Sequence, residues 1–218
     1  MNTFLVDEGV RGVLAALFVA YTEKITPNKI ECEKDYKPVQ DDLPLYLRAA
    51  ECDIQRVERA LVRYAGLQIL SDIKACLCFD GNKRYMTAYN YAHAVLESRR
   101  DIKQELSYPD VWEFFERVRE VKKEAEYFIQ SIKFRQNECG VVYAQYCPDN
   151  DITKLIMPSL FKQSPSKKFI VHDIRRNFVG ICNGRDFYYE KQDSKGGFNF
   201  EKAQKYYQSI QEKYSIKK

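Results

Sequence analysis

The feature that most constrains the fold is a change in hydrophobic periodicity near Gly140. Before it, apolar residues recur every three or four positions, which is the spacing of one face of a helix. After it come short runs of β-branched and aromatic residues, such as 141–146, that are separated by turn residues. Helices in one part of a chain and a small sheet in another are typical of the α+β class.

The N-terminal two-thirds is predicted to be mostly helical. Residues 3–6 favour a short strand, and 25–44, which holds three prolines and many charges, favours a loop or a loosely ordered arm. The predicted helices cover 10–24, 45–65 with a continuation over 66–79, 83–99, and 109 to about 134.

The C-terminal third is predicted to form a small antiparallel or mixed sheet within residues 141–190. Strands are expected at 141–146, 168–173, 178–182 and 185–190, with a helix at 152–161. Asn183-Gly184 is the strongest short hairpin signal in the chain. A closing C-terminal helix is expected at 198–214. We expect a single domain over 1–218, with 1–137 and 138–218 as the possible subdivision.

Composition favours a packed protein without a bound cofactor. The chain has 218 residues, of which 45% are hydrophobic and 30% charged, so a core is expected. The seven cysteines show no metal-ligand spacing and there are only two histidines, so we expect no metal site. No phosphate loop, dinucleotide fingerprint or HExxH motif occurs, and we expect no cofactor. The apolar stretch 13–21 is too short to span a bilayer, and we expect a cytoplasmic protein without membrane contact.

Positive charge is concentrated towards the C-terminus. Residues 1–50 carry 6 basic and 8 acidic side chains, a net charge of −2, whereas residues 162–218 carry 13 basic and 6 acidic ones, a net charge of +7. Such a segment is typical of a surface that meets phosphate. The alternative is a lysine-rich tail that serves solubility.

A second basic feature is an arginine stripe on the predicted helix 45–65. On a helical wheel it lies opposite an apolar face, and it consists of Arg48, Arg56, Arg59 and Arg63. Two interpretations stay open. The stripe is either a solvated face paired with Glu51 and Glu58, or a face that follows a phosphate backbone.

The residues best suited to catalysis or phosphate binding lie at the end of the strand 168–173. His172 is a candidate general acid or base, and Arg175 and Arg176 follow as candidate phosphate-binding cations. His172 and Asp173 are neighbours on a strand and point to opposite faces, so they do not form a simple pair. The alternative is a basic turn in which His172 has a structural role.

Several spaced motifs resemble a known family. In chain order they are Phe4-Leu5-Val6-Asp7-x-Gly9, Glu124-Ala125, Lys133-Phe134-Arg135, Tyr143-Ala144, Pro148-Asp149-Asn150-Asp151 and Ile170-Val171-His172-Asp173-Ile174-Arg175-Arg176. Their order and spacing are similar to those of a bacterial family of DNA metabolism that is encoded beside a DNA modification or repair radical SAM protein. Its domain also occurs fused to uracil-DNA-glycosylase-like domains. The chain departs from this pattern at Glu126-Tyr127, where the family has His-Arg, and at Lys133, where it has Arg.

The resemblance implies a process, DNA repair or modification, rather than a reaction. The first hypothesis is a nucleic-acid-binding protein that is accessory to a radical SAM partner. Its candidate contacts are Lys133, Arg135, Arg175, Arg176, Arg56, Arg59, Arg63 and Tyr143. The second is an enzyme acting on nucleic acid, with His172 as acid or base and Asp173 or Glu124 as the orienting carboxylate. The third is a protein-interaction module that does not bind nucleic acid. DNA is the predicted ligand, and the oligomeric state stays open.

Overall fold

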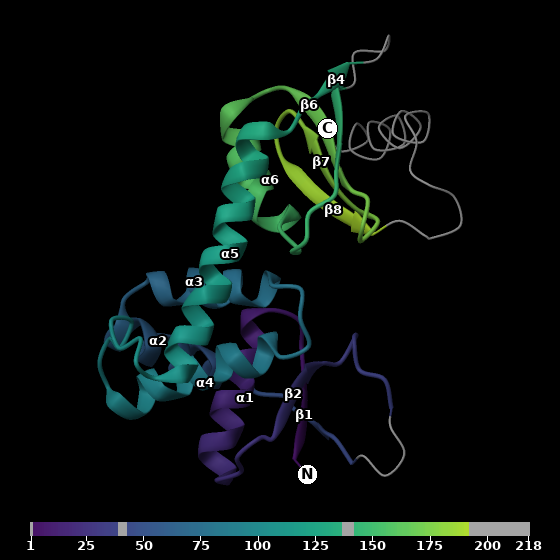
Figure 1. Cartoon of the computed structure of the whole chain (residues 1–218). Helices are drawn as coiled ribbons and strands as arrows, with labels where there is room; N and C mark the ends of the chain where they lie inside the picture. Colours follow the sequence, from purple (N-terminus) through teal and green to yellow (C-terminus); the bar gives the residue numbers. More distant parts are fainter. Residues whose placement is uncertain (1, 39–42, 137–141, 192–218) are drawn as a thin grey trace. The chain divides into compact units, whose positions relative to one another are not determined.

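The structure is a computed structural model of the 218-residue chain, and it describes residues 2–38, 43–136 and 142–191. Over these residues it has six α-helices and two β-sheets, so the predicted α+β class is confirmed (Figure 1). The chain divides into two compact units, Met1–Lys122 and Lys123–Lys218. Helix α5 (Pro109–Ser131) runs across this boundary. The single-domain expectation and its possible subdivision stay predictions.

Unit 1 is built on a three-stranded parallel sheet. Its strands are β1 (Thr3–Val6), β2 (Lys29–Cys32) and β3 (Leu45–Tyr46), in the order β2-β1-β3. Helix α1 (Val10–Glu23) makes the crossover between β1 and β2. All four residues of β1 are buried because β1 is the central strand.

Two glycines form the corner between β1 and α1. Gly9 precedes the helix with φ 86°, which L side chains rarely adopt. A Cβ on Gly12 would lie 2.0 Å from the backbone oxygen of Asp7. Glycine at position 12 therefore lets the first turn of α1 pack directly on the end of β1.

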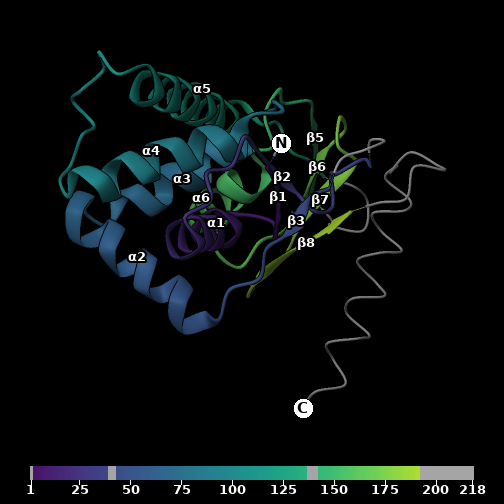
Figure 2. The same cartoon turned by 90° about the horizontal axis from the view of Figure 1, so that it is seen from below.

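The other helices of unit 1 are α2 (Glu51–Ala65), α3 (Gln68–Cys78), α4 (Arg84–Ser98) and the first part of α5. Figure 2 shows α1 to α4 grouped beside the three-stranded sheet. Their apolar faces meet in a core that includes Leu61, Ile73, Ala88 and Phe114. Phe114 stacks on Tyr91 with ring centroids 4.1 Å apart. Each large apolar side chain buried in this way contributes about 1.5–3 kcal/mol.

Two predictions for unit 1 were wrong. The expected loop 25–44 contains β2, and the expected helix 45–65 begins with a strand, because Leu45 and Tyr46 pair with Phe4 and Leu5 of β1. Ala50 then has extended backbone angles, so α2 starts only at Glu51. Arg48 lies outside the helix, where it pairs with Asp7 at 3.5 Å and with Glu33 at 2.6 Å.

Unit 2 is a five-stranded mixed sheet with one helix between its strands. Its elements are β4 (Arg135–Gln136), β5 (Val142–Tyr146), α6 (Thr153–Gln163), β6 (Lys168–Asp173), β7 (Phe178–Asn183) and β8 (Phe187–Lys191). The strand order is β4-β5-β6-β7-β8, and only the β5–β6 pair is parallel, with α6 as its crossover.

The predicted strands of this region, its helix and its hairpin are confirmed within a few residues. Strand β4 was not predicted, because two residues are too few to show an alternating pattern. A short connection joins the end of α5 to β4. The expected closing helix 198–214 lies outside the described residues.

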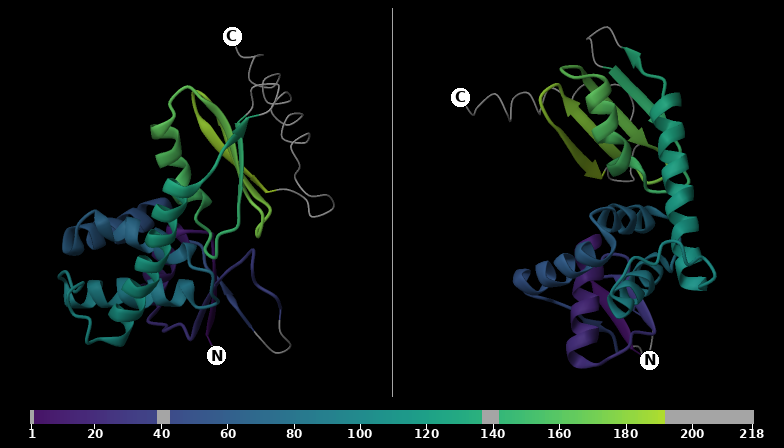
Figure 3. Two further views of the ribbon diagram at one scale, coloured as in Figure 1. Left: turned by 45° about the horizontal axis from the view of Figure 1, so that its top comes forward. Right: turned by 90° about the vertical axis from the view of Figure 1, so that its left-hand side faces the viewer.

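Helix α6 lies on one face of the five-stranded sheet. One face carries Ala144, Val171 and Gly180, and α6 lies against it (Figure 3). A Cβ on Gly180 would lie 2.7 Å from the sulfur of Met157 in α6, so the helix approaches the strand backbone closely. Because side chains alternate along a strand, Tyr143 and His172 belong to the second face.

Candidate functional site

His172 is buried on the second face of the sheet, and only 3% of its surface is exposed. Its Nδ1 lies 3.0 Å from the hydroxyl of Tyr143, and its Nε2 lies 3.1 Å from Oδ1 of Asn177. Burial lowers the pKa of His172 below its ordinary value, against the opposite effects of Asn177 and Asp173. Burial therefore favours the neutral form of the imidazole.

Glu124 lies on α5 and holds the turn that follows β5. Its Oε1 accepts the backbone N–H of Asp149 at 2.6 Å. Its Oε2 accepts the backbone N–H of Asn150 at 2.9 Å and the side-chain amide of Asn150 at 2.8 Å. One carboxylate thus satisfies three donors and ties the helix to the carboxyl end of β5. Charge-assisted bonds of this kind are about twice as strong as neutral ones.

Arg176 ties the β6–β7 turn to the same loop. Its guanidinium donates to Oδ2 of the fully buried Asp173 at 3.2 Å, to the carbonyl oxygen of Pro148 at 3.1 Å, and to that of Asp149. The backbone N–H of Arg176 also donates to Oδ1 of Asp173. Arg175 pairs with the exposed carboxylate of Asp149 at 3.0 Å. The planar fork of arginine suits this set of oxygens.

The carboxyl end of β5 and β6 is therefore a network of side chains that bind one another. Glu124, Asp173 and Arg176 hold the turns, whereas His172 bonds to Tyr143 and Asn177 on the second face. Asp173 belongs to the α6 face by register. The catalytic roles of His172, Asp173 and Glu124 stay predictions. The geometry favours a positioning role for each, because their polar atoms are engaged with the protein.

The opposite end of the sheet gathers basic side chains from three segments. We call it the basic end, and its members are the exposed residues Lys133, Arg135, Lys167, Lys168 and Arg185. Lys168 pairs with Asn183 in the sheet register, which brings the β7–β8 turn and Arg185 to this end. Within the part of the chain that the structure describes, no carboxylate pairs with Lys133, Arg135, Lys167 or Arg185. Lys133 and Arg135 are among the contacts that the sequence predicted. Lys167 and Lys168 lie far from Arg175, because the two lysines are at the start of β6 and Arg175 follows its end.

A cavity of about 430 Å³ opens at the basic end. We call it the Phe134 hollow, and it is lined by Phe134, Gln136, Val142, Ser164, Ser166, Lys167, Lys168 and Phe169. Phe134 is 38% exposed, and its ring centroid lies 5.4 Å from that of the buried Phe169, with an angle of 65° between the planes. Phe134 and Arg185 were not among the predicted site residues. The alternation of basic and aromatic residues at 133–135 is a sequence signal that points to Phe134, whereas Arg185 comes to this end only through the pairing of β6 and β7.

The predicted contacts within unit 2 do not form one surface. Arg175 and Arg176 lie at the end of β6 opposite to the basic end, and Tyr143 is buried between the two ends. Arg56, Arg59 and Arg63 lie exposed on one face of α2, in unit 1. There, Arg56 lies 3.7 Å from Asp53, and Nε of Arg59 donates to the backbone oxygen of Gln55.

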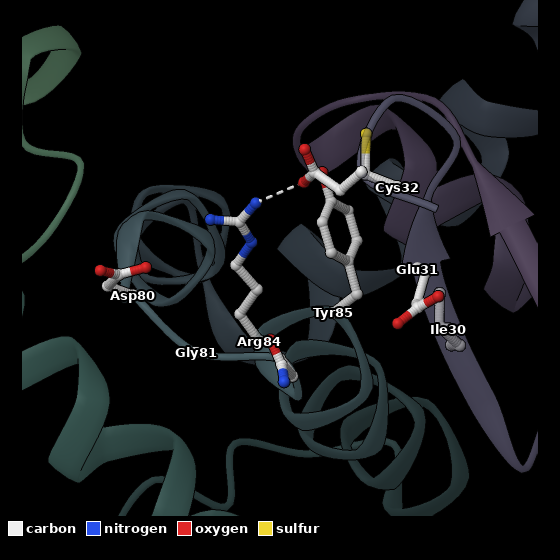
Figure 4. Close-up of a pocket in the computed structure, with 9 residues that line it drawn as sticks. Ile30, Glu31, Cys32, Asp80, Gly81, Arg84 and Tyr85 are labelled. Carbon is white, nitrogen blue, oxygen red and sulfur yellow. Dashed lines mark hydrogen bonds and ion pairs between the residues drawn. The ribbon is translucent and has the colours of Figure 1, made fainter. Parts of the chain in front are cut away.

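Unit 1 holds a second cavity, of about 290 Å³, beside the end of β2 and the start of α4 (Figure 4). Its walls include Cys32, Asp35, Arg84 and Tyr85. Arg84 pairs with Asp35 at 2.8 Å, and the Tyr85 hydroxyl accepts the N–H of Gly9 at 2.9 Å. Burial raises the pKa of Tyr85, so its phenol stays protonated at neutral pH. The cavity thus combines a paired cation with a neutral phenol, and none of its lining residues was among the predicted site residues.

The described residues hold neither a cluster of metal ligands nor a membrane-spanning helix. No three His, Cys, Asp or Glu side chains come together there in a way that could hold a metal ion. None of the helices described is long and apolar enough to cross a membrane.

The model of a family described as a domain of unknown function, DUF4130, matches residues 82–217. This match covers more than half of the chain. The chain belongs to the DUF4130 family. The matched region of DUF4130 begins in the turn before α4, and it contains α5 and all the described strands of unit 2. The side-chain network at the carboxyl end of β5 and β6 lies within the matched region, and so does the basic end.

No curated protein matches the chain. Among solved structures, a "pGpG-specific phosphodiesterase - PggH from Vibrio cholrae" aligns over 100% of both chains, with a TM-score of 0.42 and 12% sequence identity. A similarity of this degree does not establish a shared fold.

Proposed function

We propose that this protein binds single-stranded DNA through the basic end of unit 2, as an accessory protein of DNA repair or modification. The observation that carries the proposal is the basic end itself, where the exposed Lys167 and Lys168 line a hollow that also holds the partly exposed ring of Phe134, and where Lys133, Arg135 and Arg185 lie exposed on neighbouring segments. Cations neutralise phosphates, and aromatic rings stack on bases whatever the sequence. The role beside a radical SAM protein is part of the proposal and rests on the family resemblance.

The two ends of the sheet differ in whether their cations are paired with carboxylates, and this difference favours the basic end as the binding surface. At the carboxyl end, Arg175 and Arg176 are engaged by Asp149 and Asp173, so phosphate would have to compete with carboxylates. At the basic end, Lys133, Arg135 and Lys167 have no such partner among the residues that the structure covers. These three side chains can therefore bind phosphate without breaking an ion pair within the described residues.

The test is the salt dependence of binding, measured by fluorescence anisotropy with a labelled oligothymidylate. With about four phosphate contacts, affinity should fall about 50-fold between 50 and 200 mM salt, since each contact contributes about −0.7 to the logarithmic slope. The double variant Lys167→Gln/Lys168→Gln should lower the magnitude of this slope by about 1.4. Lys74→Gln/Lys123→Gln is the matched control, because it removes two exposed lysines elsewhere.

Absent binding, or binding that does not change with salt, would contradict the proposal. An oligouridylate of the same length tests the choice of DNA. If RNA binds as tightly, the ligand is single-stranded nucleic acid in general.

The arginines of α2 are a separate part of the proposal. The triple variant Arg56→Gln/Arg59→Gln/Arg63→Gln should lower the magnitude of the slope by about 2 if all three contact phosphate. An unchanged slope would assign these arginines to a solvated helix face.

A further inference from the structure

We infer that the Phe134 hollow takes a single unpaired nucleobase, so that the protein recognises bases as well as the phosphate backbone. The inference rests on the proposed function, and it names the part of the nucleic acid that the site accepts. Duplex DNA keeps its bases stacked in the helix, so a hollow of this kind selects single strands or bases that have left the stack.

The first support is the placement of Phe134. Its ring meets the ring of the buried Phe169 in an edge-to-face contact, which fixes its position from the protein side. At the same time 38% of its surface stays exposed, at the rim of the cavity. An anchored and partly exposed aromatic ring is the usual platform on which single-stranded nucleic acid stacks.

The second support is the set of polar groups in the hollow. Gln136, Ser164 and Ser166, which carry an amide and two hydroxyl groups, are among the residues that line the cavity together with Phe134. Amides and hydroxyls both donate and accept hydrogen bonds, as the edges of all bases require. None of the eight lining residues is acidic, and Lys167 and Lys168 add two positive charges to the lining. The chemistry therefore fits a neutral ring attached to an anionic backbone.

The third support is that the wall of the hollow is held in place. Lys167 donates its backbone N–H to Ser164, and the thiol of Cys182 donates to the carbonyl oxygen of Lys167 at 3.3 Å. The β7–β8 turn also packs closely, since a Cβ on Gly184 would lie 2.8 Å from the oxygen of Ser166. A fixed wall lowers the ordering cost of binding. The volume of about 430 Å³ lies within the roughly 300–1,000 Å³ of typical small-ligand sites.

The test separates stacking from electrostatics with two variants of Phe134. Phe134→Leu keeps an apolar side chain but removes the aromatic face, and it should weaken binding of single-stranded DNA about 10-fold. The salt slope should stay as in the wild type, because no charge is lost. Phe134→Tyr keeps the aromatic face and should bind like the wild type. Urea unfolding of each variant shows whether it is folded.

The DNA is varied in parallel, by using an oligonucleotide in which abasic sites replace the bases. The effect of Phe134→Leu should vanish on this DNA, because the ring then has no base to stack on. In addition, 2-aminopurine in an oligonucleotide should change its fluorescence when the wild-type protein binds. This measurement does not depend on the folding of any variant.

Equal loss on normal and abasic DNA, or no change in 2-aminopurine fluorescence, would overturn the base-binding inference while salt-dependent binding upholds the proposed function. Absent binding by the wild-type protein at every salt concentration would contradict both.

Discussion

The hydroxyl of Tyr143 lies 3.0 Å from Nδ1 of His172, across the parallel strands β5 and β6. On the other side of the ring, Nε2 lies 3.1 Å from Oδ1 of Asn177, which has φ 49° in the β6–β7 turn. A neutral imidazole satisfies both bonds when the phenol donates to Nδ1 and the Nε2 proton is donated to the amide oxygen. His172 thereby links two strands and the turn between β6 and β7.

The Tyr143–His172 bond should contribute to stability. Tyr143→Phe removes the donor to a buried ring nitrogen, which should lower the free energy of unfolding by about 1–3 kcal/mol. Urea unfolding measures this change. Tyr127→Phe is the matched control, because Tyr127 is exposed, and its effect should stay within about 0.5 kcal/mol. An equal effect in both variants would show that the bond adds nothing.

The buried His172 should make the protein less stable in weak acid. Burial lowers the pKa of His172 in the folded state, whereas the unfolded chain titrates near the ordinary value of about 6.5. Below that pH the unfolded state binds its proton first, so the free energy of unfolding should fall from pH 7 to pH 5. The slope from one proton is at most about 1.4 kcal/mol per pH unit.

The contribution of His172 to this slope is isolated with His172→Gln, which should show a smaller decline between pH 7 and pH 5. The control is His93→Gln, which removes the other imidazole of the chain from unit 1. Urea unfolding at several pH values measures the slopes. The same decline in His172→Gln and the wild type would assign the pH dependence to other groups.

Glu124 should be needed for the turn that follows β5. Glu124→Gln removes the charge and presents an amide N–H₂ group to backbone donors, so we expect a loss of about 1.5–3 kcal/mol. Glu126→Gln, on an exposed position of the same helix, should have little effect. Hydrogen exchange at the amides of Asp149 and Asn150 reports the turn directly. Unchanged exchange in Glu124→Gln would contradict this role.

Arg176 should act in the fold rather than on DNA. Arg176→Met leaves the buried carboxylate of Asp173 without its cation, which should cost about 3 kcal/mol, the lower end of the range for buried pairs because Arg176 is partly exposed. Arg175→Met removes only an exposed pair and should cost at most about 1 kcal/mol. Urea unfolding gives both values. A lower salt slope of DNA binding in folded Arg176→Met would instead place Arg176 on phosphate.

Local patterns in the sequence were sufficient for much of unit 2. The spans of β5, β6, β7 and α6 follow from local composition and turn residues, because the strands are short runs rich in β-branched and aromatic residues and the hairpin carries Asn183-Gly184. The helical periodicity predicted the wrong start for the helix expected at 45–65. A helical wheel records spacing along one segment, whereas the start of that segment is decided by pairing with β1, more than 35 residues away.

The sequence alone determined the α+β class, most strands of the second sheet, and the presence of basic side chains around 133–135 and 167–176. Only the tertiary structure decided what these residues do. Arg175 and Arg176 follow Lys167 and Lys168 within nine positions, yet an extended strand separates them to opposite ends of the sheet. Lys133 and Lys167 are distant in sequence, but the pairing of β4, β5 and β6 brings their segments together around the Phe134 hollow. Charge and aromatic character are local properties, whereas a binding surface depends on long-range strand pairing.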